Sequence, residues 1–165
     1  MQKSEIERGK QIAYRFLSYR PRSKKEVERK LKEKKISGEN ISNIISLLER
    51  NNYLNDKEFT LNWVKYRMEN RPSGRRSLEY ELREKGIDSE TIKDSLDEVY
   101  SGEFDEYEVA VRLAEKKIAS LRNKKMEYNV FKRRIFSYLQ RKGFSFSLIE
   151  RVMSNLLHTE SIESI

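Results

Sequence analysis

Three pairs of adjacent basic residues recur along the chain and have the chemistry to hold an anion. They are Lys24-Lys25, Arg75-Arg76 and Lys132-Arg133. We expect each pair in or near the first turn of a helix, where free N–H groups and the helix dipole favour phosphate or carboxylate. Descent from duplicated units, or neutralisation by neighbours such as Glu28 and Glu79, would produce the same column without a function. The six residues are the candidate partner- or DNA-binding residues.

Catalytic groups are sparse. The chain has no cysteine and one histidine, His158, so it lacks a thiolate metal site, a Cys nucleophile and the material for a His triad. Phosphate-binding and dinucleotide-binding glycine motifs are missing from the sequence. Its carboxylates stand at helical spacing from bases, as in Glu26–Lys30 and Glu81–Lys85, which is typical of solvated helix surfaces. We therefore expect no enzyme activity, no cofactor and no metal.

The elements that would carry the basic pairs form a threefold repeat. Segments 30–36, 81–87 and 138–144 align on Leu31, Leu82 and Leu139, seven residues after the first base of each pair. We call these leucines the anchors. Apolar residues recur at fixed offsets from them, in steps of three and four that are typical of helices with one buried face. The predicted core residues at offsets −4, +5, +10, +14 and +17 are Val27, Leu78 and Ile135; Ile36, Ile87 and Phe144; Ile41, Ile92 and Ile149; Ile45, Leu96 and Met153; Leu48, Val99 and Leu156.

Helix ends repeat as well. Two units place a glycine, Gly86 or Gly143, at offset +4, where a left-handed residue ends a helix, and the first unit has Lys35 there. Pro21 and Pro72 stand ten residues before their anchors and separate a first helix from a second. N-caps are expected at Ser23 (with Glu26), Ser37, Asn55 (with Glu58), Asp88 and Ser145.

A further helix opens each unit, over residues 4–19, 56–70 and 104–122. The expected apolar faces are Ile6, Ile12, Ala13, Phe16 and Leu17 in the first; Phe59, Trp63 and Tyr66 in the second; and Tyr107, Ala110, Val111, Ala114, Ile118 and Leu121 in the third. Trp63 is expected in the core rather than exposed for base stacking.

The pattern predicts an all-α protein, a tandem array of three three-helix repeats with about nine helices. Units this small bury little alone and must stack, so we expect an elongated or curved shape. The predicted divisions are residues 1–54 (first repeat with an N-terminal extension), 55–102 (second repeat), 103–158 (third repeat) and 159–165 (C-terminal tail).

Three local patterns make the chain resemble the RecX family, bacterial regulators of the RecA recombinase. They are Arg20-Pro21-Arg22-Ser23 followed by Val27 and Leu31; Tyr53-Leu54-Asn55-Asp56 followed by Phe59; and Gly74 through Leu82 running into Lys85-Gly86-Ile87. The family often has two acids at Asn55-Asp56 and a small residue at Thr60. The resemblance implies three-helix repeats without catalysis that bind the recombinase–DNA filament. It also implies that binding usually inhibits ATPase, filament extension and strand exchange in homologous recombination, DNA repair and the SOS response.

The net charge and its distribution along the chain indicate what kind of partner the protein binds. The chain carries 35 bases and 27 acids, a formal charge of +8, with basic outer repeats and a slightly acidic middle one. This layout favours a partner of mixed charge, such as protein-coated DNA. The alternative is a stand-alone nucleic-acid-binding repeat protein that contacts phosphates, and weak, sequence-tolerant DNA binding is expected in either case. A helix-turn-helix regulator fits less well, because no single recognition helix stands out. We expect a cytoplasmic monomer without membrane contact, because no apolar run is long enough to span a bilayer.

Overall fold

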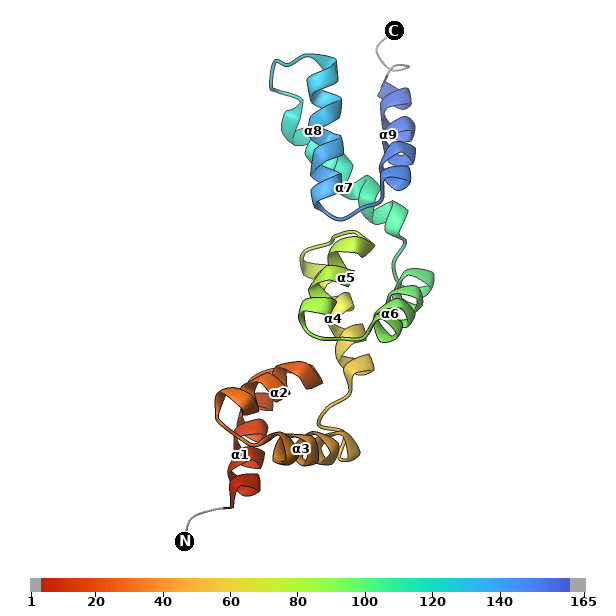
Figure 1. Cartoon of the computed structure of the whole chain (residues 1–165). Helices are drawn as coiled ribbons and strands as arrows, with labels where there is room; N and C mark the ends of the chain where they lie inside the picture. Colours follow the sequence, from red (N-terminus) through yellow and green to blue (C-terminus); the bar gives the residue numbers. More distant parts are fainter. Residues whose placement is uncertain (1–3, 161–165) are drawn as a thin grey trace. The chain divides into compact units, whose positions relative to one another are not determined.

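The computed structural model describes residues 4–160, with side chains to Leu157, and this part of the chain forms nine α-helices and no strand (Figure 1). The all-α prediction is therefore confirmed. The helices are α1 (Glu5–Leu17), α2 (Lys24–Glu33), α3 (Gly38–Arg50), α4 (Asp56–Asn70), α5 (Arg75–Glu84), α6 (Ser89–Gly102), α7 (Glu106–Leu121), α8 (Tyr128–Arg141) and α9 (Phe146–Glu160).

The chain divides into two compact units whose boundary passes through α4, α5 and α6. Unit 1 contains the described residues up to Trp63 together with Glu81–Ser95, and unit 2 contains Val64–Tyr80 together with the described residues from Leu96 onward. The sequence-based divisions at residues 54, 102 and 158, and the elongated or curved shape, stay predictions. Residues 1–3 of the predicted extension and 161–165 of the predicted tail lie outside the described residues.

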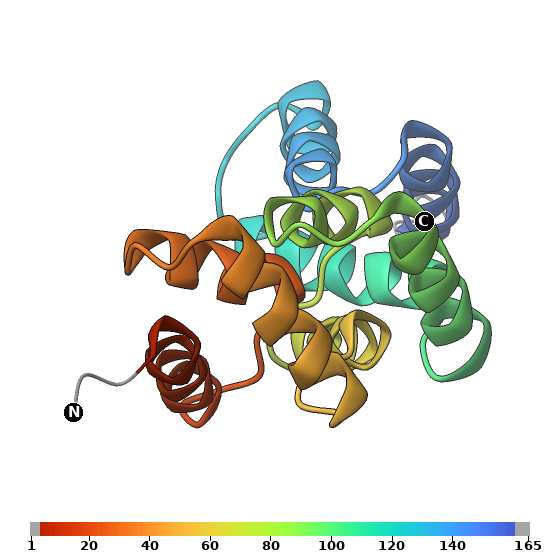
Figure 2. The ribbon, with the colours of Figure 1, turned by 60° about the horizontal axis from the view of Figure 1, so that its bottom comes forward.

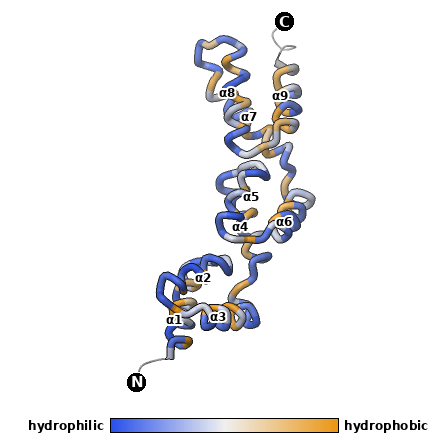
Figure 3. The backbone as a smooth tube through the Cα atoms, in the orientation of Figure 1, coloured by the Kyte–Doolittle hydropathy of each residue, from blue (hydrophilic) through white to orange (hydrophobic). Residues whose placement is uncertain are grey.

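In unit 1, α1, α2 and α3 pack on one another around the first anchor. Val27, Leu31, Ile44 and Leu48 are fully buried there. Most residues along α2 are hydrophilic (Figure 3). Only Val27, Leu31 and the capping residue Glu26 of this helix are buried. The predicted capping box is present: the Ser23 hydroxyl accepts from the Glu26 amide at 3.2 Å, and the Glu26 carboxylate accepts from the Ser23 amide at 3.1 Å.

In unit 2, α7 lies across α8 and α9 in both views (Figure 1, Figure 2). Ile135, Leu139 and Ile149 are buried at this junction. Across all three repeats the predicted core positions at the anchor and at offsets −4, +5 and +10 are buried. Met153 and Leu156 are corrections, since both are only half-buried and the neighbouring Val152 and Leu157 are buried instead.

The opening helix α4 corrects a second expectation. Phe59 is buried, but Tyr66 is 59% exposed and Trp63 is half-buried, while Thr60, Val64 and Met68 face the core. The Trp63 indole N–H donates to Glu81 at 3.3 Å, and the Lys85 ammonium lies 3.9 Å from its ring centroid. Large aromatic side chains with a polar edge thus sit at the boundary of the core, and smaller residues fill its centre.

In the opening helices α1 and α7, the buried residues are fewer or shifted relative to the predicted faces. Ala13 is buried in α1, with Ile6, Ile12, Phe16 and Leu17 half-buried around it. In α7, Val109 and Leu113 are buried, whereas Tyr107 and Val111 are half-buried.

The predicted helix stops are left-handed in all three repeats. The backbone φ angle is 59° at Lys35, 75° at Gly86 and 88° at Gly143. Of the predicted N-caps that follow, Asp88 and Ser145 accept from the amides of Thr91 and Leu148. Ser37 does not cap α3 with its side chain; its hydroxyl donates to Glu5 at 2.7 Å instead.

Candidate functional site

The first basic pair forms the first two residues of α2, as predicted, but its anion is supplied by the chain itself. The Lys24 amide donates to the carboxylate of Asp56, the first residue of α4, at 2.8 Å. The Lys24 ammonium pairs with Glu49 of α3, and this hydrogen bond raises the pKa of Lys24 above its ordinary value. Burial raises the pKa of Asp56, partly offset by the Lys24 amide. The helix N-terminus is therefore already occupied by an internal carboxylate.

Lys25 faces outward. Its ammonium lies 3.2 Å from Glu28, with the Lys25 side chain 62% exposed. Its stem packs against Gly86, where an added Cβ would stand 2.4 Å from the Cβ of Lys25.

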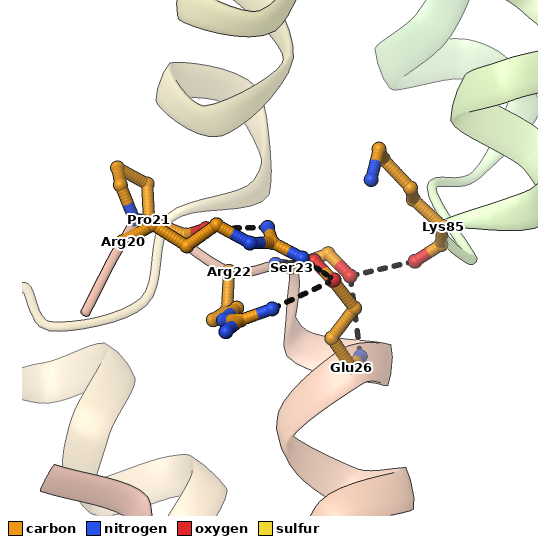
Figure 4. A network of polar contacts seen from close by, with 6 residues as sticks. All are labelled: Arg20, Pro21, Arg22, Ser23, Glu26 and Lys85. Atoms are coloured by element: carbon orange, nitrogen blue, oxygen red, sulfur yellow. Dashed lines mark hydrogen bonds and ion pairs between the residues drawn. The ribbon is translucent and has the colours of Figure 1, made fainter. Parts of the chain in front are cut away.

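A polar network beside this pair links the first repeat to the second (Figure 4). The Ser23 hydroxyl donates to the carbonyl of Lys85 at 2.6 Å, and Arg20 and Arg22 approach Glu26 at 2.7 and 3.6 Å. Burial alone would raise the pKa of Glu26, but the hydrogen bonds from Arg20 and the Ser23 amide outweigh burial and hold this pKa below its ordinary value. Burial lowers the pKa of Lys85. The buried carboxylate is thus compensated on several sides.

The second pair reproduces the arrangement of the first. The Arg75 amide donates at 2.9 Å to Glu106, the first residue of α7, and its guanidinium pairs with Asp97 at 2.6 Å and Glu79 at 3.3 Å. The Arg76 amide donates to the carbonyl of Gly143 at 3.2 Å, while its side chain is exposed.

These contacts define what we call a joint, the place where the second helix of one repeat meets the next repeat. Its first contact runs from offset −8 to the carbonyl at offset +3 of the following repeat, as in Ser23 to Lys85 and Gly74 to Lys142, the latter at 2.8 Å. The second contact joins the offset −7 amide to the acid that opens the following repeat. Sequence reasoning missed this acid, although Glu5, Asp56 and Glu106 recur at the start of every opening helix.

The third pair departs from the expectation. Lys132 and Arg133 lie in the second turn of α8, because this helix begins at Tyr128. The third repeat lacks the proline that delays the second helix in the other two, and Asn129 stands in its place. The amide of Lys132 is therefore inside the helix, so only the side chains of Lys132 and Arg133 remain to bind an anion.

This third pair lines an open groove of about 680 Å³ between α8 and α9. Its polar lining is Lys132, Arg133, Glu150 and Ser154, and its apolar lining is Tyr128, Phe136, Met153 and Leu157. The Lys132 ammonium lies 4.8 Å from the Tyr128 ring centroid, and within the described residues neither Lys132 nor Arg133 has a carboxylate partner. Neither Arg75 nor Arg76 lines this groove, although all four residues belong to unit 2.

A second basic and aromatic groove lies in unit 1, outside the predicted column. Its lining includes Arg15, Tyr19, Lys30 and Lys34, and Tyr19 is 71% exposed. Among the described residues, no three acidic or histidine side chains are grouped so that they could hold a metal ion. Nor does any helix among them combine the length and hydrophobicity that crossing a membrane requires.

Three family models match successive segments of the chain. They describe the first, second and third three-helix domains of RecX and match residues 10–46, 55–96 and 105–153, respectively. The predicted array of three three-helix repeats is thereby confirmed.

Curated relatives agree with these matches. The regulatory protein RecX of Bacillus subtilis is 41% identical over 152 residues, which cover 92% of this chain and 56% of that protein. The RecX of Bacillus licheniformis is 36% identical, with 90% and 55% covered. The chain thus spans about half the length of these two relatives. The RecX of Pelodictyon phaeoclathratiforme is 34% identical, with 88% of this chain and 87% of that protein covered.

Solved structures carry the same fold. The crystal structure of RecX from Lactobacillus salivarius superposes with a TM-score of 0.82 at 31% identity, covering 92% of this chain and 96% of that one. A second RecX crystal structure, 24% identical, shares the fold with a TM-score of 0.78. Because its three repeats each match a RecX domain and a relative of similar length shares a third of its residues, the chain belongs to the RecX family of regulatory proteins.

Proposed function

We propose that this protein binds the filament of the RecA recombinase on DNA and reduces its ATP hydrolysis, filament extension and strand exchange. Its place would be in homologous recombination, DNA repair and the SOS response, as a regulator without catalysis of its own. The observation that carries the proposal is the match of all three repeats to RecX domains, whose relatives are named regulatory proteins.

The contacts of the basic pairs sharpen which residues would touch DNA. Lys24 and Arg75 are held by internal carboxylates and serve the joints. The side chains of Lys25, Arg76 and Arg133 are exposed, and Lys132 lines an open groove. We assign the phosphate contacts to Lys25 and Arg76, which lie outside the groove, with weak and sequence-tolerant binding as the outcome.

Stand-alone nucleic-acid binding is the second candidate, and the groove around Tyr19 favours it. An exposed aromatic ring among Arg15, Lys30 and Lys34 has the composition of sites that stack bases and follow a phosphate backbone. In this case the protein would bind single strands without the recombinase.

The deciding experiment measures single-strand-dependent ATP hydrolysis and strand exchange by a bacterial RecA with increasing amounts of the full chain. Regulation predicts inhibition at amounts stoichiometric with filament protomers and at physiological salt. A protein that leaves both activities unchanged there, but binds bare DNA with a steep loss of affinity as salt rises, is a stand-alone binder.

A further inference from the structure

The open groove of the third repeat corresponds to a place that is filled in the first two repeats. In the second repeat, offsets −7, −3, +15 and +18 are Arg75, Glu79, Asp97 and Tyr100. Arg75 holds the Glu106 carboxylate and pairs with Glu79 and Asp97. Burial and the nearby Glu106 raise the pKa of the Tyr100 hydroxyl. The Arg75 amide and the Tyr100 side chain thus lie near the first residue of α7, and Glu79 and Asp97 hold the Arg75 guanidinium beside it.

The first repeat shows the same neighbourhood around the entry of α4. Lys24 at offset −7 holds Asp56, and Glu49 at offset +18 acts electrostatically on the same carboxylate. In the third repeat the equivalent residues are Lys132, Phe136, Ser154 and Leu157, and all four line the open groove. No helix enters there among the described residues.

The two helices that fill this place share a sequence pattern. α4 begins Asp56-Lys57-Glu58-Phe59 and α7 begins Glu106-Tyr107-Glu108-Val109. Each has an acid at its first and third positions and a buried apolar residue at its fourth. The first acid accepts a hydrogen bond from the backbone amide of the base at offset −7 of the preceding repeat, and the apolar residue is buried in the core.

We propose that the groove between α8 and α9 binds an α-helix of a partner protein that begins with this acid-x-acid-apolar pattern. The carboxylates of the partner helix meet Lys132 and Arg133, which have no carboxylate partner among the described residues. Its apolar side covers Tyr128, Phe136 and Met153, of which Tyr128 is 56% exposed. A base between the two acids, as in α4, complements Glu150. The proposal stands apart from filament binding and does not depend on it.

A second copy of the chain is a poor occupant. Its α1 begins Glu5-Ile6-Glu7-Arg8 and lacks the apolar fourth residue. Its Glu5 is already held by the Ser37 hydroxyl at 2.7 Å and by the Asn40 amide group. Lys35 stands where the following repeat of each joint has a glycine, Gly86 or Gly143, and neither joint leaves space for a Cβ at that position. The apolar half of the groove lining also favours a helix over a nucleic acid strand.

The test is the binding of a fluorescently labelled peptide of residues 54–70, the α4 segment, to the full chain, followed by anisotropy. The peptide is expected to bind saturably. The double variant Lys132→Glu/Arg133→Glu should weaken binding about tenfold or more. The matched control is Arg134→Glu, which alters an exposed base of α8 outside the groove lining and should change binding less than about twofold.

A charge swap distinguishes the loss of charge pairing from misfolding of the double variant. A peptide with Asp56→Lys and Glu58→Lys should bind the wild-type chain poorly and the double variant well. Peptide binding that ignores both sets of charges, or no binding at millimolar peptide, overturns the proposal. Concentration-dependent dimers abolished by Lys132→Glu would instead assign the groove to a second copy, and displacement of the peptide by single-stranded DNA would assign it to nucleic acid.

Discussion

The amide of Arg75 donates a 2.9 Å hydrogen bond to the carboxylate of Glu106, the residue that opens the next repeat. The matching bond from Lys24 to Asp56 shows that this contact belongs to the repeat and not to one site. A basic pair whose position suggests an anion-binding site thus also takes part in a joint between two repeats. In the first two pairs, one base anchors the following repeat through its backbone amide, and the side chain of the other remains exposed to solvent.

Replacing a glycine at a joint with alanine should destabilise the protein far more than its backbone conformation alone implies. Gly143 has φ 88° and an added Cβ would lie 2.5 Å from the Ser77 amide, so Gly143→Ala should cost about 2–4 kcal/mol of unfolding free energy. Gly38→Ala is the control, because no atom lies within 4 Å of its added Cβ, and it should stabilise by up to about 1 kcal/mol. Urea denaturation measures both. Equal changes in unfolding free energy for the two variants would contradict the close packing proposed for Gly143 at the joint.

At Lys35 the opposite result is expected. This residue is left-handed with φ 59°, and Lys35→Gly should raise the free energy of unfolding by up to about 1 kcal/mol, since the backbone strain is relieved. Lys34→Gly, one position earlier and without positive φ, should lower it. Thermal unfolding of the two variants compares them directly, and a loss of stability in Lys35→Gly would refute this account.

Acid should weaken the contribution of Glu26 to stability. Its pKa is lowered in the folded protein, so the stabilisation is complete above the ordinary value of about 4.5 and is lost as the pH falls through the folded pKa. Glu26→Gln should therefore cost about 1–3 kcal/mol at pH 7 and distinctly less near pH 3. Glu84→Gln, an exposed carboxylate of α5, should show no such difference. Urea unfolding at both pH values tests this, and a constant cost for Glu26→Gln would contradict it.

Within the part of the chain that the structure describes, the buried hydroxyl of Ser95 has no hydrogen-bond partner. The equivalent residues in the other repeats are Ile44 and Val152. Ser95→Ala should stabilise the protein by about 1 kcal/mol, because it removes an unsatisfied polar group and improves helix propensity. Thermal unfolding measures the change in stability. Ser101→Ala, at an exposed position of α6, is the comparison and should change the stability less. A destabilised Ser95→Ala would indicate a partner for the hydroxyl.

DNA binding should depend on the exposed bases of the column. Replacing Lys25 and Arg76 with Gln should weaken binding about equally across sequences and flatten its salt dependence by roughly one power of salt concentration per lost contact. The control replaces two exposed bases outside the column, Arg29 and Arg83, with Gln and has the same net charge. Electrophoretic or anisotropy titrations at several salt concentrations measure both. Identical losses in the two variants would mean that net charge alone governs binding.

The sequence by itself determined the all-α class, the three repeats and most of the core. Apolar spacing and helix-ending residues act locally, so Leu31, Leu82 and Leu139 could be recognised as equivalent and are all fully buried. The left-handed stops at Gly86 and Gly143 and the Ser23 capping box follow from the same short-range chemistry.

Only the tertiary structure decided which bases are free. Lys24 and Lys132 are equivalent in sequence, yet one is held by Asp56 and Glu49 and the other faces an open groove. The partners of Lys24 lie 25 and 32 residues further along the chain, and no local pattern specifies which acid will meet which amide. The half-buried positions of Trp63 and Met153 have the same origin, because burial at a repeat's edge depends on whether another element packs there and not on the residue's own hydrophobicity.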